Sequence, residues 1–130
     1  MKTLAQRLMA CKHFRWMPGM QIANRDDNLA LTWRIVHCHT NWLTLWDERS
    51  IIERPAKALT DDDLFPDLSD PATLGCVLAL VEGRYGDGCY VQNLNGGLYG
   101  DGWVVFIDDQ ALTERHQTRA HALVAALEAA

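Results

Sequence analysis

Two histidines around a cysteine, "HCH" at positions 37 to 39, are the first candidates for a metal site in this sequence. On a regular strand, His37 and His39 point to the same face, a spacing that can chelate one metal ion. A complete site needs one or two more ligands, such as His13 or Cys11 brought close by folding. Nothing in the spacing requires those ligands, so we interpret the pair as strand-end histidines and predict no metal.

A second candidate is the acidic run "DDDLFPDLSD", which holds five aspartates between positions 61 and 70. It lacks the alternating acidic pattern of a known calcium loop. Two interpretations stay open. The run is a solvated loop with a helix cap, or its carboxylates imitate nucleic-acid phosphates and occupy a basic groove of a partner. The second interpretation assigns partner binding to Asp61, Asp62, Asp63 and Asp67.

The glycine-rich run "NGGLYGDG", residues 95 to 102, is a third candidate. Such loops cradle phosphate when their amides converge at a helix start. Here a strand is expected to follow and no Lys-Ser/Thr pair is present, so the run favours a hairpin connection with positive φ angles. The alternative is a site for a small ligand such as a nucleotide, lined by Arg84, Tyr85, Gly96, Gly97 and Tyr99.

Nucleophilic catalysis finds little support in this sequence. Ser50 and Ser69 are the two serines, and neither lies in a GxSxG elbow. Cys76 falls inside an apolar helical pattern, where a thiolate is unfavourable. We therefore predict that the protein is not an enzyme and uses no cofactor.

Tryptophan is abundant, with five residues in a chain of 130. In "WLTLW", Trp42 and Trp46 alternate with Leu43 and Leu45, so the indoles share the face opposite the leucines. If the leucines point inward, the strand presents two exposed aromatic anchors of the kind found at protein interfaces. The alternative is that a helix or the segment 47–68 covers them.

Composition limits the class of protein. Apolar residues make up 48% and charged residues 22%, which is typical of one globular domain spanning residues 1–130. The net charge of −5 argues against direct, nonspecific nucleic-acid binding. No apolar run reaches membrane-spanning length, and no secretory leader is evident. We expect a cytoplasmic protein whose four cysteines are thiols.

The elements that must position these residues begin with a helix and a hairpin. An apolar stripe predicts a helix over 3–16, ended by Pro18 and Gly19 in "MPGM". The bulky residues around that pair are expected to seal the helix end, a stabilising role. Alternation predicts strands at 29–37 and 42–46 that pair as an antiparallel hairpin. The segment 47–68 is expected to be irregular.

The second half repeats this order. Asp70 and Pro71 predict a helix start, and the helix should run to "GDG" at 86–88. "CYVQNL" and "WVVFID" predict a second hairpin, and the unbroken apolar run "WVVFI" predicts helices on both faces. A last helix should begin near Asp109 or Thr113. The predicted fold class is α+β, with one four-stranded antiparallel sheet and three helices in the order αββαββα, sandwich-like.

Four stretches carry a resemblance to a known group: "FRWMPGM", "DLSDPATLGCVLALVEGRYGD", "GWVVFIDD" and "HALVAALEAA". Together they resemble a family of small, mostly uncharacterised proteins encoded by bacteriophages and prophages, with an α/β/α (ABA) sandwich domain. The resemblance covers about half of the chain. Residues 24–57 depart from it, and it transfers no catalytic motif.

This resemblance implies a viral accessory role in a bacterial host cell. Several similar phage proteins bind and disable a host enzyme or defence complex, so anti-defence or anti-CRISPR inhibition is the expected form of activity. The expected partner is a host protein, with a basic nucleic-acid-binding protein as one form of it. The alternatives are the small-ligand or nucleotide sponge and a structural or assembly protein, whose homo-oligomer would use the same two indoles.

Overall fold

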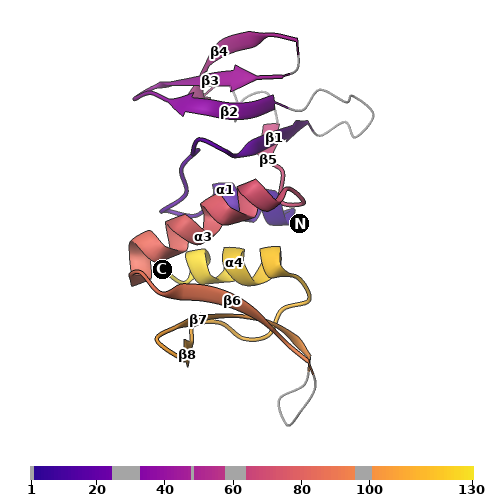
Figure 1. Ribbon diagram of the computed structural model, residues 1–130, viewed down its shortest axis with the longest axis vertical. Coiled ribbons are helices and arrows are strands. Elements are labelled where there is room, and N and C mark those ends of the chain that lie inside the picture. The colour runs from indigo at the N-terminus through magenta and orange to yellow at the C-terminus, as the bar shows by residue number, and fades with distance from the viewer. Residues whose placement is uncertain (1, 25–32, 48, 58–63, 96–100) are drawn as a thin grey trace. The chain divides into compact units, whose positions relative to one another are not determined.

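The computed structural model in Figure 1 describes residues 2–24, 33–47, 49–57, 64–95 and 101–130. The chain divides into two units by its internal contacts. Unit 1 holds Met1–Phe14 and Val77–Ala130, and unit 2 holds Arg15–Cys76. The expectation of one domain over residues 1–130 stays a prediction, and the broad α+β class is confirmed.

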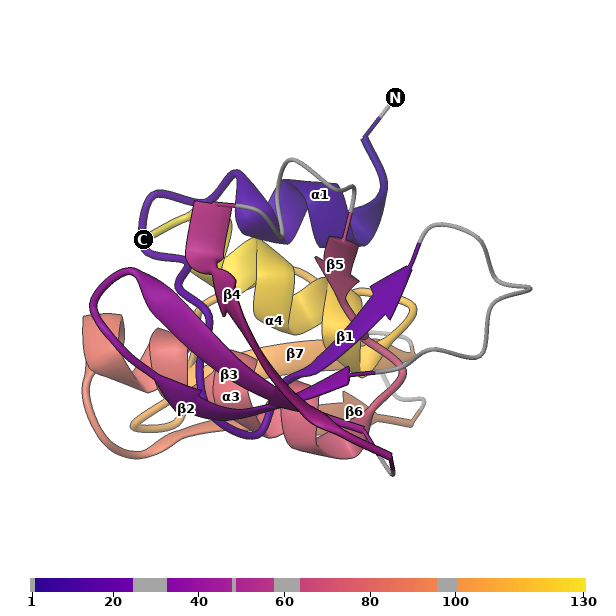
Figure 2. The ribbon, with the colours of Figure 1, turned by 90° about the horizontal axis from the view of Figure 1, so that it is seen from above.

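Unit 2 contains a five-stranded antiparallel sheet with the order β4-β3-β2-β1-β5. Figure 2 shows β2, β3 and β4 running alongside one another. Its largest fully buried side chains come from alternate positions of these strands and from Met20. The strands are β1 (Gln21–Asn24), β2 (Trp33–Cys38), β3 (Trp42–Trp46), β4 (Ile51–Pro55) and β5 (Leu64–Pro66).

Unit 1 contains a three-stranded antiparallel sheet of β6 (Cys89–Leu94), β7 (Gly102–Ile107) and β8 (Gln110–Ala111), in that order. The helix α4 (Arg119–Glu128) packs against β6 and β7 and lies along one face of the sheet in Figure 1. The short helix α1 (Leu4–Met9) packs against α4. The core therefore lies between α4 and the sheet.

The helix α3 (Pro71–Tyr85) begins and ends as the sequence predicted. The Asp70 carboxylate accepts the Thr73 backbone N–H at 2.9 Å, which satisfies one of the free donors at the helix start. Pro71 occupies the first helical position, where its missing N–H costs nothing. After the helix, Gly86 and Gly88 take φ angles of +109° and +100°, which side chains disfavour.

The two predicted hairpins are present, but they do not join in one sheet. β2 pairs with β3, and β6 pairs with β7, each antiparallel. The expected single four-stranded sheet is wrong because β1 and β5, which the sequence patterns did not reveal, extend the first hairpin within unit 2. β8 extends the second hairpin within unit 1.

The expectation of an irregular segment over 47–68 is also wrong. It contains β4, which pairs with β3 along its whole length, and β5, which pairs with β1. Both strands are short, and β5 has three residues. Their pairing partners, rather than any alternation of their own, hold them extended.

The first helix ends at Met9, well before the predicted end at residue 16. A capping box between Thr3 and Gln6 starts it, with the Thr3 hydroxyl accepting the Gln6 N–H and the Gln6 side chain accepting the Thr3 N–H. Leu8 is its one fully buried residue, so packing supports a short helix only.

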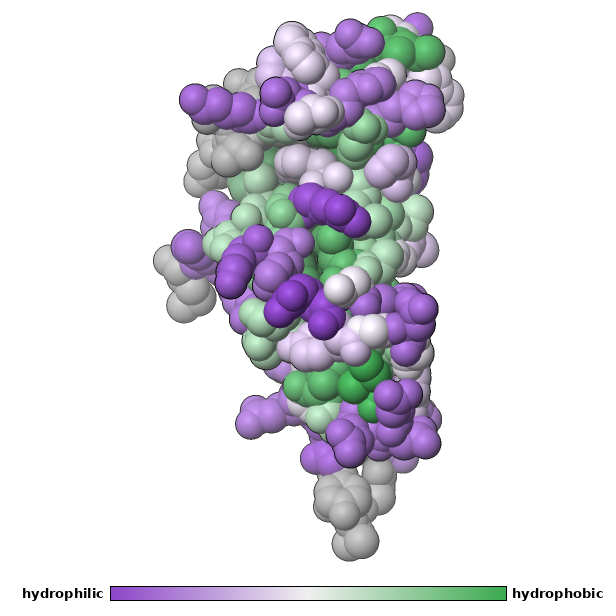
Figure 3. Space-filling view, turned by 90° about the vertical axis from the view of Figure 1, so that its left-hand side faces the viewer, coloured by the Kyte–Doolittle hydropathy of each residue, from purple (hydrophilic) through white to green (hydrophobic). Residues whose placement is uncertain are grey.

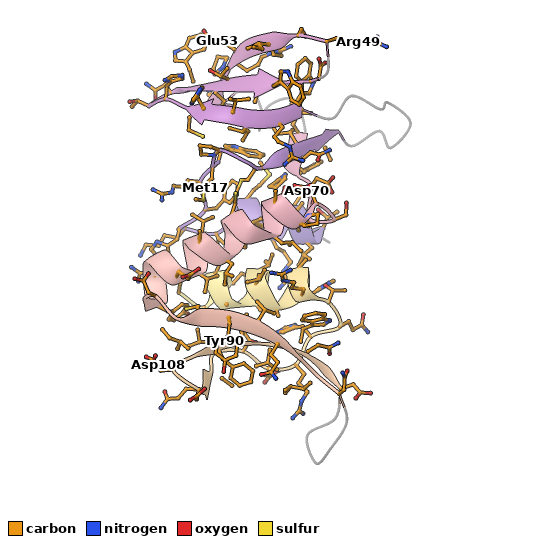
Figure 4. All side chains as sticks on the ribbon, viewed as in Figure 1. Met17, Arg49, Glu53, Asp70, Tyr90 and Asp108 are labelled. Atoms are coloured by element: carbon orange, nitrogen blue, oxygen red, sulfur yellow. The ribbon has the colours of Figure 1, made fainter. Side chains whose placement is uncertain are left out.

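The Pro18-Gly19 pair does not end that helix but turns the chain toward β1. Gly19 takes a φ of +98° and donates its N–H to the Ile35 carbonyl at 2.8 Å. Met20 is fully buried, while Met17, labelled in Figure 4, is half-buried. The turn therefore places one methionine in the core next to β2.

The last helix begins at Arg119, and its predicted start near Asp109 or Thr113 is wrong. Asp108 and Asp109 instead form the turn between β7 and β8, with φ angles of 48° and 64°. The chain then stays beside β7, because Leu112 donates to the Val105 carbonyl. Thr118 caps the helix by accepting the His121 N–H at 3.1 Å.

The helices expected on both faces of "WVVFI" are present on one face only in the part of unit 1 that the structure describes. Val105 and Ile107 lie on the face that α4 covers, and Val105 is fully buried. The opposite face carries Phe106, whose ring stacks on Tyr90. Figure 4 shows Tyr90 on the side of β6 away from α4.

Candidate functional site

The strand β3 presents two tryptophans to solvent. Its burial alternates, with Leu43 and Leu45 almost fully buried and Trp42 and Trp46 exposed by 50% and 45%. The leucines therefore point inward, and neither a helix nor the 47–57 part of the segment covers the indoles. Of the two interpretations that the sequence left open, the structure supports the exposed one.

The neighbouring strand β4 extends this surface. Trp46 pairs with Ile51, Thr44 pairs with Glu53, and Trp42 pairs with Pro55. Side chains that pair directly across an antiparallel ladder share one face. Ile51 is 68% exposed. We call this surface the tryptophan face, and it consists of Trp42, Thr44, Trp46, Ile51, Glu53 and Pro55.

The tryptophan face gathers apolar groups that usually lie inside proteins. Two indoles and an isoleucine are exposed on adjacent strands, and Val36 is exposed next to the β-bulge of β2. Figure 3 shows hydrophobic residues among hydrophilic ones at the level of β4. Contiguous apolar surface of this kind marks interaction sites.

One end of the tryptophan face is hollowed. A depression of about 320 Å³ lies between His39, Trp42 and Glu53. The backbone N–H of His39 donates to the Trp42 carbonyl at 2.7 Å, which holds the β2–β3 turn. His39 Nε2 also lies 3.4 Å from the Thr44 hydroxyl oxygen. Figure 4 shows Glu53 on the outer strand β4.

The two histidines of "HCH" are exposed, and their ring centroids lie 6.3 Å apart. Among the residues that the structure describes, no group of three or more His, Cys, Asp or Glu side chains is placed to hold a metal ion. His13 and Cys11 belong to unit 1, whereas the two histidines belong to unit 2. The pair is therefore assigned to the rim of the tryptophan face.

The acidic run divides into a part outside the described residues and a part with structural contacts. Asp61, Asp62 and Asp63 lie outside the described residues. The Asp67 carboxylate accepts the N–H and hydroxyl of Ser69 at 3.0 and 2.6 Å. Asp67 follows β5, and β1 and β2 separate that strand from β3. The structure therefore does not bring Asp67 to the two tryptophans.

The last aspartate of the run, Asp70, links the start of α3 to β2. Its carboxylate accepts two hydrogen bonds from the Arg34 guanidinium, each 3.2 Å long, and one from the Thr73 hydroxyl. Burial alone would raise the pKa of Asp70. The hydrogen bonds from Arg34 and Thr73 outweigh burial and hold this pKa below its ordinary value. Figure 4 shows Asp70 at the start of α3.

The four cysteines are free thiols. Burial is the largest influence on the pKa of each thiol and raises it, more than nearby positive charges lower it. The neutral form therefore dominates near neutral pH. Ser50 and Ser69 have local roles instead, because their hydroxyls donate to the carboxylates of Asp47 and Asp67. These contacts explain the residues without invoking a nucleophile.

Of the residues proposed for a small ligand, two lie among the described residues, Arg84 and Tyr85. The Tyr85 hydroxyl donates to the Ala126 carbonyl at 3.1 Å, and Arg84 is exposed near the end of α3. Gly96, Gly97 and Tyr99 lie outside the described residues. Tyr85 therefore supports the packing of α3 on α4 within unit 1.

A groove that sequence reasoning missed lies on the outer face of the unit 1 sheet. It measures about 870 Å³. In Figure 3, hydrophobic residues bordered by hydrophilic ones reach the surface at this level. The alternation of Tyr90, Gln92 and Leu94 in β6 is the signal that could have found this face. The lining residues are Leu94, Val104, Phe106, Asp109, Ala111, Thr113, Glu114 and Arg115.

Tyr90 contacts two of the residues that line this groove. Its ring stacks on Phe106 with centroids 5.3 Å apart, and its hydroxyl donates to Asp109 at 3.2 Å. Partial burial and the neighbouring Asp109 carboxylate raise the pKa of the Tyr90 phenol, so it stays a donor. The groove thus has an aromatic wall and a carboxylate in the left-handed turn at its end.

No family model, curated protein or solved structure matches this chain. None of the described helices is long and apolar enough to cross a membrane. The tryptophan face and the groove of unit 1 are therefore the two candidate sites.

Proposed function

We propose that this chain is an accessory protein of a bacteriophage or prophage that acts by stoichiometric binding to a bacterial host protein. Inhibition of a defence complex, including a CRISPR complex, is the proposed consequence. The observation that carries the binding proposal is the exposure of Trp42 and Trp46 on one strand beside Ile51. The resemblance to small phage proteins supports the biological setting.

The physical reason is the free energy of burying these side chains. Tryptophans dominate the affinity of many protein interfaces because they bury a large apolar area with few rotatable bonds. The sheet supports both indoles rigidly, since Leu43 and Leu45 anchor β3 from its other side. Binding would therefore need little ordering of the chain.

The experiment is affinity capture from a bacterial host lysate with three forms of the protein. The wild type should retain a defined host protein in a one-to-one ratio, and Trp42→Ala/Trp46→Ala should not. Tyr90→Ala is the matched control, because Tyr90 is an exposed aromatic residue on the other sheet. Retention by the double variant, with unchanged circular dichroism, would reject the tryptophan face.

Light scattering separates host binding from self-association. The structural or assembly alternative buries the same indoles between copies of this chain. In that case the purified wild type would be an oligomer and the double tryptophan variant a monomer. The host-binding proposal expects a monomer for both.

A separate experiment tests whether the acidic run contributes to the association with a partner. Carboxylates at Asp61, Asp62, Asp63 and Asp67 would steer a basic partner, so neutralising them should slow association and flatten its salt dependence. Asp67→Asn alone also weakens the hydrogen bonds that Asp67 accepts from Ser69, so the triple change at 61–63 is the cleaner variant. Unchanged rates and salt dependence would remove the run from the interface.

A second candidate function is the binding of a small apolar ligand, and the groove of unit 1 favours it. Its volume of about 870 Å³ is in the range of ligand sites, and Leu94, Val104 and Phe106 give it an apolar lining. This candidate expects a thermal shift with a low-molecular-weight extract that Phe106→Ala abolishes and Trp42→Ala does not.

A further inference from the structure

The groups that border the depression between His39, Trp42 and Glu53 favour a narrower class of ligand than the tryptophan face as a whole. The register pairs Thr44 with Glu53 and Trp42 with Pro55, so Trp42 and Glu53 are diagonal neighbours on one face. Diagonal neighbours on paired strands are within reach of long and aromatic side chains. An indole and a carboxylate therefore border the same hollow.

These two groups attract the same kind of ligand. The face of an indole carries negative electrostatic potential and attracts cations, and a carboxylate attracts them by charge. Glu53 makes no hydrogen bond or ion pair with another residue in the described part of the chain, and it is exposed. The hollow thus presents an aromatic surface and an available anion to a cationic group.

The size and surroundings of the hollow favour a side chain over a larger ligand. Its volume of about 320 Å³ is at the lower end for binding sites, and apolar Trp46 and Ile51 continue the surface beside it. A planar guanidinium can stack on an indole while it donates two parallel hydrogen bonds to a carboxylate. An ammonium group lacks that planar match.

We infer that the hollow receives an arginine side chain of the partner protein, stacked on Trp42 and paired with Glu53. This inference rests on the proposed function, because it names the group that the partner inserts at the end of the tryptophan face. The flanking apolar residues of the partner then contact Trp46 and Ile51. His39 closes the third side and is held by its bonds to Trp42 and Thr44.

The test uses a defined probe in place of the unknown partner. The peptide acetyl-Leu-Arg-Leu-amide is titrated into ¹⁵N-labelled protein in mildly alkaline buffer, and the indole N–H signals of the five tryptophans are followed. The Trp42 signal should shift in a saturable manner, and the Trp103 signal should not. The same peptide with citrulline in place of arginine keeps the shape and removes the charge.

We expect the citrulline peptide to bind at least about fivefold more weakly, because it lacks the charge that the indole and the carboxylate attract. Glu53→Gln should remove most of that difference, and Trp42→Phe should weaken the arginine peptide while keeping an aromatic wall. Asp87→Asn, which neutralises an exposed carboxylate in unit 1, is the control outside the tryptophan face and should leave both affinities unchanged. Glu53 and Trp42 are both exposed, so these variants should keep the wild-type spectrum elsewhere.

Equal affinity for the two peptides would overturn the inference, and so would the absence of any saturable shift at Trp42. Neither result would by itself reject the proposed function. Loss of the host protein on Trp42→Ala/Trp46→Ala in the capture experiment would still support the tryptophan face. If the capture experiment retains no host protein while the arginine peptide still binds, the proposed function fails and the binding of arginine in the hollow is unrelated to a host protein.

Discussion

The hydroxyl of Thr73 links two elements of unit 2 by hydrogen bonds. Thr73 is fully buried, donates its hydroxyl proton to Asp70 and accepts the backbone N–H of Gln21 at 2.9 Å. It therefore joins the first turn of α3 to β1. No pattern in the sequence predicts this contact, because the two residues it links are far apart in the chain. The Asp70 cap beside it was predicted, since Asp-Pro is a local signal.

Replacing Thr73 by valine keeps the shape of the side chain and removes both hydrogen bonds. We expect the free energy of unfolding to fall by about 1–3 kcal/mol, because the Gln21 N–H loses its acceptor and the Asp70 carboxylate loses one of its donors. Denaturant unfolding measures this loss. Thr40→Val is the control at an exposed position and should change the free energy by less than about 0.5 kcal/mol.

Asp70 makes the stability of the folded protein depend on pH in the acidic range. Its pKa is lower in the folded protein than in the unfolded chain, so it stabilises the fold above the unfolded value, about 3.9. That contribution is lost as the pH falls through the folded pKa. We expect the unfolding free energy of Asp70→Asn to fall less steeply below about pH 4 than that of the wild type. Equal slopes would contradict this, and Asp87→Asn, in an exposed turn, is the control.

The alternation of Trp42 and Trp46 with leucine is the residue-scale feature that the sequence predicted best. Period-two alternation assigned the indoles to one face, but it could not decide whether another element covered that face. Only the tertiary structure leaves them exposed. The hollow with Glu53 was beyond sequence reasoning, because the strand β4 that carries Glu53 was expected to be irregular.

At the scale of elements, local signals predicted both hairpins and α3, while pairing partners distant in the chain decided the rest. Ile22 of β1 pairs with Pro66 of β5, a connection that spans most of unit 2. Short strands without alternation carry no signal of such pairing. For this reason the sequence suggested one sheet where the described residues form two.

The packing of α4 on the sheet of unit 1 sets the stability of that unit. Leu123 is fully buried on α4. Leu123→Ala should lower the free energy of unfolding by about 2–5 kcal/mol, because it removes buried apolar volume and leaves a cavity. Ile51→Ala removes a similar group from an exposed position and should cost far less. Similar losses for both variants would contradict the assignment of core and surface.

At the scale of the whole molecule, the helix α3 contributes residues to both units. Thr73 belongs to unit 2, whereas Val77 and Val81 belong to unit 1, and all three are buried. Unfolding of this helix would remove core residues from each unit. We therefore expect one cooperative unfolding transition, in agreement with the sequence-based expectation of a single domain.

The tryptophans make this expectation measurable. Trp103 lies in unit 1, and the other four lie in unit 2: Trp16, Trp33, Trp42 and Trp46. The fluorescence of a Trp103→Phe variant therefore reports on unit 2, while far-ultraviolet circular dichroism reports on all helices. The two denaturation curves should coincide. Two separated midpoints would show that the units unfold independently.

The central claim is that the tryptophan face binds a host protein stoichiometrically, and isothermal titration of the captured partner tests it most directly. We expect a one-to-one complex with the wild type and at least about a hundredfold weaker binding of Trp42→Ala/Trp46→Ala, since each interface tryptophan is expected to carry a large share of the affinity. An unchanged dissociation constant for the folded double variant would contradict the claim.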